Sequence, residues 1–139
     1  LRHDDEDDLA VAKLSKSQMQ ATNFLPLNAD KPGSQLDVRR YLTPGKYTIV
    51  AYLSPYDEPS TSLEPRLVQL SQVRNDIAVR TVNINRPGVE GVDWQSPIMQ
   101  NAQIQKLPYF LIYDPAQNLR AKGRPAYEGV MQWLRELPN

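Results

Sequence analysis

The strongest structural signal in this sequence is the stretch KYTIVAYL at residues 46–53. It is rich in β-branched and aromatic residues and has almost no polar interruption. A strand with one covered face alternates apolar and polar residues, whereas a strand covered on both faces is apolar nearly throughout. The stretch therefore predicts a central strand with a layer packed on each of its faces.

The segments that follow predict a regular succession of helices and strands. Leu63, Leu67 and Leu70 recur at helical spacing, so a helix is expected within residues 61–76. Similar patterns predict a strand at Ile77–Asn85, a short helix at 93–104, strands at 108–114 and 119–123, and an amphipathic helix at 126–137. Asp93 stands at the start of the short helix and is expected to cap it.

This order of elements predicts an α/β fold with a central mixed sheet. The first strand, helix and strand favour a right-handed crossover between parallel strands. The later two strands, joined by the short turn at 115–118, favour an antiparallel pair. We expect helices on both faces of the sheet.

The N-terminal residues differ in composition from the rest of the chain. The run HDDEDD at residues 3–8 holds five carboxylates and the only histidine, and such a run repels itself and buries nothing. We expect residues 1–22 to form a flexible acidic segment, in which residues 9–22 are either a short helix or a tether. Residues 23–139 are expected to form the domain, and its first part, 24–34, holds two prolines and a glycine and is expected to be irregular.

Composition excludes several kinds of chemistry. The 139 residues include no cysteine, which rules out disulfides, thiolate catalysis and cysteine-bound zinc. Lys+Arg and Asp+Glu are 16 each, so net charge gives no reason to expect nucleic acid as a partner. No stretch approaches the roughly 18 consecutive apolar residues of a membrane span. No metal-ligand spacing or phosphate-binding glycine loop is present, so no metal or cofactor is expected. For the acidic run, cation binding by His3 and its neighbours is the alternative interpretation.

The segment AYLSPYDEPSTSLEPRL at residues 51–67 resembles the active-site segment of the thioredoxin family. In that family an apolar strand is followed by roughly A-P-W-C-G-P-C and by a helix with an internal proline. Tyr56 matches the aromatic position, Asp57 and Ser60 match the two cysteines, and Pro65 matches the internal proline. The match has no gap.

A second segment, IQKLPYFLIYDPAQNL at residues 104–119, supports the same resemblance. Leu107 and Pro108 match the family's hydrophobic residue and cis-proline that precede a strand. The resemblance covers about residues 34–137 and points in particular to TlpA-type exported thioredoxin-like domains. It implies a thioredoxin-like fold.

The resemblance also implies which chemistry this chain lacks. Dithiol exchange requires a thiolate that attacks a disulfide and a second thiol that resolves the intermediate. A carboxylate at position 57 and a hydroxyl at position 60 cannot perform it, and Ala51 stands where the family tends to carry a buried acid. We therefore expect no thiol–disulfide oxidoreductase activity, and no catalytic residue is assigned.

Asp57 has two interpretations. At the start of a helix its carboxylate can accept backbone N–H bonds and complement the helix dipole, which stabilises by about 0.5–2 kcal/mol. The alternative is a non-redox enzyme that uses Asp57, Glu58 and Ser60. A serine nucleophile requires a base, however, and the only histidine is His3 in the acidic run.

The function expected is that of a redox-inactive module that binds a protein or an extended peptide segment. In the thioredoxin family the backbone beside the cis-proline pairs with the substrate, and such main-chain pairing does not depend on sulfur. The expected binding face consists of Tyr56, Asp57, Glu58, Ser60, Leu107 and Pro108. A structural oligomerisation module with an unused groove is the other alternative, and the oligomeric state stays open. The resemblance to exported reductases, together with a first residue other than Met, leads us to expect an extracytoplasmic location, periplasmic or secreted.

Overall fold

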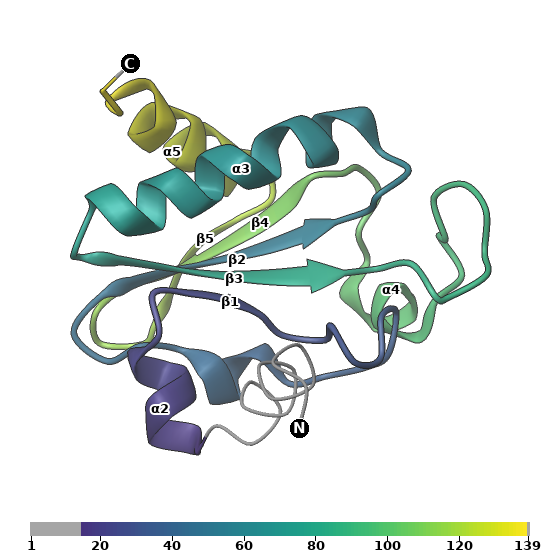
Figure 1. Cartoon of the computed structure of the whole chain (residues 1–139), viewed down its shortest axis with the longest axis horizontal. Coiled ribbons are helices and arrows are strands. Elements are labelled where there is room, and N and C mark those ends of the chain that lie inside the picture. The colour runs from purple at the N-terminus through teal and green to yellow at the C-terminus, as the bar shows by residue number, and fades with distance from the viewer. Residues whose placement is uncertain (1–14, 139) are drawn as a thin grey trace, which may run out of the picture.

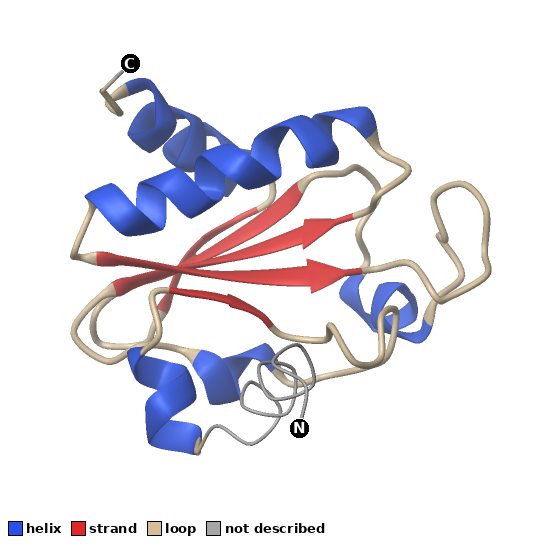
Figure 2. Ribbon diagram, viewed as in Figure 1, coloured by secondary structure: helices blue, strands red, loops and turns tan. Residues whose placement is uncertain are grey.

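The computed structural model describes residues 15–138, which form a five-stranded sheet with helices on both faces (Figures 1 and 2). The strands are β1 (Phe24–Pro26), β2 (Tyr47–Leu53), β3 (Ile77–Asn83), β4 (Tyr109–Tyr113) and β5 (Leu119–Lys122). The helices are α2 (Lys16–Ala21), α3 (Glu58–Val73), α4 (Pro97–Ala102) and α5 (Arg124–Arg135), and η1 (Val38–Tyr41) is a 3₁₀ turn. The acidic run lies outside the described residues, so its flexibility stays a prediction.

The sheet is mixed, and its strand order is β1-β3-β2-β4-β5. β2 and β3 are neighbouring parallel strands joined by the crossover helix α3, and Leu53 at the end of β2 is paired with Asn83 at the end of β3. β4 runs antiparallel to β2, with Tyr52 opposite Tyr109, and β5 runs antiparallel to β4. The α/β class, the mixed sheet and the helices on both faces are confirmed.

β2 is the middle strand and is covered on both faces, as its apolar sequence predicts. Because side chains alternate along a strand, Ile49, Ala51 and Leu53 pack toward α3 and α5. Val50 and Tyr52 point the other way and pack with residues of η1 and α4. Figure 1 shows α3 and α5 on one side of the sheet and α2 and α4 on the other.

Two local predictions are wrong. Residues 24–34 are not wholly irregular, because β1 pairs in parallel with β3, Phe24 beside Val79. Three residues are too few to show the alternation of a strand in the sequence. Pro26 also argues against a strand, although proline is tolerated in an edge strand. Asp93 does not cap the short helix: α4 begins after Ser96 with Pro97 in its first turn, a position that suits proline.

Arg80 on β3 is a buried cation that attaches α2 to the sheet. Its side chain is 0% exposed, and this burial lowers the pKa of Arg80 to about 10. Its donors bind four backbone carbonyls and one hydroxyl, those of Met19, Gln20, Tyr41, Val79 and Thr43. The Thr43 hydroxyl in turn donates to the Gln20 carbonyl. Residues 15–22 of the predicted N-terminal segment thus pack onto the domain as the short helix that the sequence left open.

Within residues 15–138, no helix combines the length and the apolar character needed to cross a membrane.

Candidate functional site

The two predicted site segments lie at the same edge of the sheet. Residues 54–57 leave the carboxyl end of β2 and lead into α3, and residues 107–108 enter β4. Since Tyr52 is opposite Tyr109 and neighbouring strands are about 4.8 Å apart, the residues just after β2 and just before β4 lie next to each other. Figure 1 shows both connections at the end of the sheet to which the β2 and β3 arrows point.

Asp57 is the cap of α3, as the sequence predicts. Its Oδ2 accepts a hydrogen bond from the backbone N–H of Ser60 at 3.0 Å and another from the Ser60 hydroxyl at 2.6 Å. These bonds satisfy one of the free N–H groups of the first helical turn. Ser60 is only 1% exposed, so its side chain supports Asp57 and contributes little surface.

Of the predicted site residues in the β2–α3 segment, Tyr56 and Glu58 are the exposed ones. The Tyr56 side chain is 52% exposed, although its backbone N–H is held by the Ser54 hydroxyl at 3.1 Å. The Glu58 carboxylate accepts a hydrogen bond from the Ser62 hydroxyl one helical turn later. An aromatic ring with a fixed backbone therefore projects at the start of α3.

Leu107 and Pro108 are joined by a cis peptide bond. The Leu107 side chain is 6% exposed and packs with Tyr52 and Met99, on the sheet face opposite α3. Its side chain is therefore an anchor and does not line a groove. The backbone is different: among residues 15–138, no partner is found for the N–H or C=O groups of Lys106 and Leu107.

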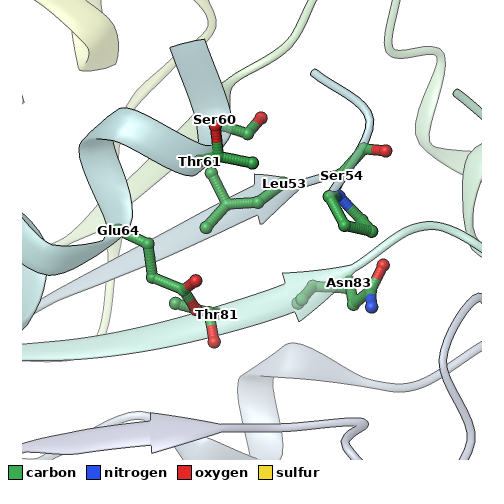
Figure 3. Close-up of a pocket in the computed structure, with 9 residues that line it drawn as sticks. Leu53, Ser54, Ser60, Thr61, Glu64, Thr81 and Asn83 are labelled. Carbon is green, nitrogen blue, oxygen red and sulfur yellow. The ribbon is translucent and has the colours of Figure 1, made fainter. Parts of the chain in front are cut away.

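A hollow of about 180 Å³ lies between α3 and the carboxyl ends of β2 and β3 (Figure 3). It is lined by Leu53, Ser54, Pro55, Ser60, Thr61, Glu64, Thr81, Val82 and Asn83. Among these residues only Ser60 is a predicted site residue. A usable signal was present, since Ser54 and Asn83 are polar residues at the ends of two parallel strands, where α/β sheets commonly bind ligands.

A buried polar network fixes the loop that follows β3 to the end of β2. The Ser54 hydroxyl donates to Asn85 Oδ1 at 2.6 Å, and the Asp93 N–H donates to the same oxygen at 3.2 Å. Arg86 binds the Asp93 carboxylate through two nitrogens, at 2.8 and 3.1 Å. The hydrogen bond from Arg86 is the main cause that lowers the pKa of Asp93 to about 2. The Asp93 carboxylate is therefore bound by Arg86 and does not cap α4.

The described residues offer no ready metal site. Within 15–138, no three or more acidic or histidine side chains are grouped so that they could hold a metal ion.

No family model matches the sequence, and no curated protein matches it either. Solved structures do resemble it. Thioredoxin f from spinach chloroplast, in its long form, is 14% identical, with a TM-score of 0.54 over 88% of this chain and 93% of that one. A chain from a structural study of thiol resolution in yeast mitochondrial 1-Cys peroxiredoxin by glutathione/thioredoxin systems is 14% identical, with a TM-score of 0.49 over 86% of this chain and 98% of the other. Mitochondrial thioredoxin 3 from Saccharomyces cerevisiae is 17% identical, with a TM-score of 0.45 over 67% and 80% of the two chains.

The similarity to thioredoxin f, together with the sheet order, shows that this chain has a thioredoxin-like fold. At such low identity the similarity defines the fold alone. No cysteine is available at Asp57, at Ser60 or anywhere else in the chain.

Proposed function

We propose that this chain is a redox-inactive thioredoxin-like module that binds an extended segment of a partner protein. The binding face is the edge of the sheet at residues 54–60 and 106–109. Composition supports the redox-inactive part of the proposal, because a chain without cysteine can form neither an attacking thiolate nor a resolving thiol. The exported location expected from the resemblance belongs to the same proposal.

The observation that carries the proposal is the free backbone of Lys106 and Leu107 beside the exposed Tyr56. Nearly all backbone N–H and C=O groups in folded proteins are paired, either within the chain or with water or a ligand. Two consecutive residues without a partner among the described part of the chain offer donors and acceptors to an added extended segment. Burial of the Leu107 side chain holds that backbone in place.

The side chains of the β2–α3 segment supply the other wall of the face. Tyrosine is enriched at interfaces because its ring buries a large apolar area while its hydroxyl stays hydrogen-bonded. The backbone of Tyr56 is held by Ser54, and the following Asp57 is fixed to Ser60, so the ring stands on a rigid base. Glu58 adds negative charge next to it.

Amide chemical-shift mapping with capped, extended heptapeptides tests the proposal on ¹⁵N-labelled protein. We expect shifts concentrated at residues 54–60 and 106–109. Tyr56→Ala should weaken binding about fivefold or more, as loss of an aromatic anchor does. Leu119→Ala is the matched control, because Leu119 is 44% exposed and is paired with Tyr113, at the opposite end of β4 from this edge. Shifts that spare both segments, or a stable dimer that buries Tyr56, would exclude the proposed binding face.

A further inference from the structure

β5 is an edge strand, and part of its backbone points away from the sheet. It is last in the strand order and pairs with β4 on one side only. The Gly123 N–H donates to the Phe110 carbonyl, and hydrogen-bonded and non-hydrogen-bonded pairs alternate along an antiparallel ladder. The next pair, Lys122 with Leu111, is therefore non-hydrogen-bonded, and the Lys122 N–H and C=O face outward. A hydrogen-bonded pair also flanks Leu119 at the other end of the strand, so its backbone faces outward as well.

These outward groups are available to an added strand. Among residues 15–138, the backbone groups of Leu119 and Lys122 bond to no backbone group of another segment. An edge strand with free N–H and C=O groups is a template for an extended segment. The Leu119 side chain is 44% exposed, so such a segment would also cover apolar surface.

The edge of β5 is basic. Arg120, Lys122 and Arg124 stand at alternate positions, and no acidic residue comes between them. The Arg120 and Arg124 side chains are 67% and 87% exposed, and each lies near one carboxylate, Asp114 at 3.2 Å and Glu128 at 3.5 Å. Ion pairs at the surface are weak, so these cations can still attract further carboxylates. The Lys122 side chain is exposed too.

This charge favours an acidic occupant over a second copy of the same edge. Like charges directly opposite one another destabilise a strand pair, and charged edge strands resist pairing with themselves. An extended segment with several carboxylates is the complementary partner. The chain contains such a segment in the acidic run HDDEDD at residues 3–8, which has five carboxylates. The run lies outside the described residues, and its charge follows from its sequence.

The described chain begins near enough for the run to reach β5. Ser15 precedes α2, which packs beside η1, and the guanidinium of Arg39 in η1 lies 5.7 Å from the centroid of the Tyr113 ring. Tyr113 is paired with Leu119. The widths of a helix, a turn and a strand spacing put Ser15 about 25 Å from Leu119. Seven extended residues, from Ser15 back to Asp8, also span about 25 Å.

We propose that the acidic run at residues 3–8 pairs with the edge of β5 in the same molecule, with its carboxylates facing Arg120, Lys122 and Arg124. The pairing covers the free backbone of this edge and keeps other extended chains away from it. A short tether gives an effective concentration in the millimolar range, which favours the molecule's own run over that of a second copy. This edge differs from the proposed binding face, so the inference does not rest on the proposed function.

A spin label beside the run tests the proposal on the full chain. Because the chain has no cysteine, the variant Arg2→Cys can be labelled with a nitroxide at that position alone. Broadening of ¹⁵N-amide signals then reports which part of the domain the run approaches. We expect broadening concentrated at residues 118–123. It should disappear when residues 4–8 are changed to asparagine and glutamine, and weaken at about 1 M salt, where the Debye length is about 3 Å.

Matched variants separate this edge from other cations on the surface. The double variant Arg120→Gln and Lys122→Gln should abolish the broadening. The control is the double variant Lys31→Gln and Arg135→Gln, which removes two exposed cations elsewhere and should leave the broadening unchanged. Without the carboxylates of the run, hydrogen exchange of the Lys122 amide should become about fivefold faster or more, the scale of several lost charge pairs. Otherwise unchanged amide spectra show that each variant is folded.

Three results would overturn the proposal. Broadening that occurs only between separate molecules, in a mixture of spin-labelled and ¹⁵N-labelled protein, excludes pairing within one molecule. Broadening centred on another basic segment, such as Arg39 and Arg40 of η1, excludes the edge of β5 as the site. Absence of broadening at any amide excludes the docking of the run altogether.

Discussion

Asp57 and Ser60 occupy the two positions that the resemblance assigns to cysteines, and the Ser60 hydroxyl donates a hydrogen bond of 2.6 Å to Asp57 Oδ2. The same oxygen accepts the backbone N–H of Ser60. At the positions where the resemblance would place two sulfur atoms, at the start of a helix, this chain has a carboxylate and the two groups that donate to it. This pair starts α3 and fixes the position of the neighbouring Tyr56.

Removal of the cap should destabilise the domain. Asp57→Ala leaves the Ser60 N–H without its acceptor, and we expect the free energy of unfolding to fall by about 1–2 kcal/mol. Ser60→Ala keeps the N–H bond to Asp57 and should cost about 1 kcal/mol or less. Urea denaturation of the two variants measures both values. Equal stability of Asp57→Ala and the wild type would show that the cap contributes nothing.

Cysteines placed at positions 57 and 60 should give the chain weak dithiol chemistry. In the double variant Asp57→Cys and Ser60→Cys, the two sulfurs lie at the cap and third position of α3, and the helix N-terminus favours the first as a thiolate. We expect a disulfide on oxidation and weak reductase activity, since Ala51 supplies no proton-transfer group. Thiol titration and insulin reduction measure the two properties, with each single variant as the control. A folded double variant that forms no disulfide would show that the frame itself differs from that of the redox-active family.

The elements that the sequence predicts well are those with long, local patterns. β2, β3 and α3 are identified because each repeats apolar residues over several positions within one segment. β1 is not predicted, because its three residues form a strand only through pairing with β3. Arg80 likewise reads as one polar residue in an apolar strand, since the carbonyls that bind it come from Met19, Gln20 and Tyr41.

The candidate site shows the same division between local and non-local features. The cap at Asp57 follows from its place before a helix and is confirmed. The hollow is not predicted, because Glu64 and Thr81 come to line the same space only after α3 packs across β3. The burial of Leu107 is also a matter of packing, since its side chain joins the cluster on the far face of the sheet.

The Arg86–Asp93 ion pair should give stability that disappears in acid. The pKa of Asp93 is lowered from 3.8 to about 2, so the folded state holds the ionised carboxyl more strongly than the unfolded state does. The stabilisation is therefore complete above about pH 4 and is lost as the pH falls toward 2. Asp93→Asn should be less stable than the wild type at pH 6, and the difference should shrink below pH 4.

Urea denaturation of the wild type and Asp93→Asn at a series of pH values measures this difference directly. Other carboxylates titrate in both proteins, so the comparison isolates Asp93. Arg86→Gln should remove the same pH dependence, because the hydrogen bond from Arg86 is the main cause of the shift. A difference between wild type and Asp93→Asn that stays constant from pH 6 to pH 2 would contradict the prediction.

Arg80 should be the most costly single side chain to remove on the α2 side of the sheet. Arg80→Met fills similar space but leaves the Met19, Gln20 and Tyr41 carbonyls without their donor, and a loss of about 3–5 kcal/mol is expected for a broken buried network. Arg80→Lys keeps the charge with fewer donors, so its stability should lie between those of the wild type and Arg80→Met. The control is Arg120→Met, at a largely exposed position, which should change stability by less than about 0.5 kcal/mol. Hydrogen exchange gives the decisive readout, because the amides of α2 should lose protection in Arg80→Met before those of β2 and β3. Unchanged protection of α2 in a folded Arg80→Met protein would mean that the helix is held by other contacts.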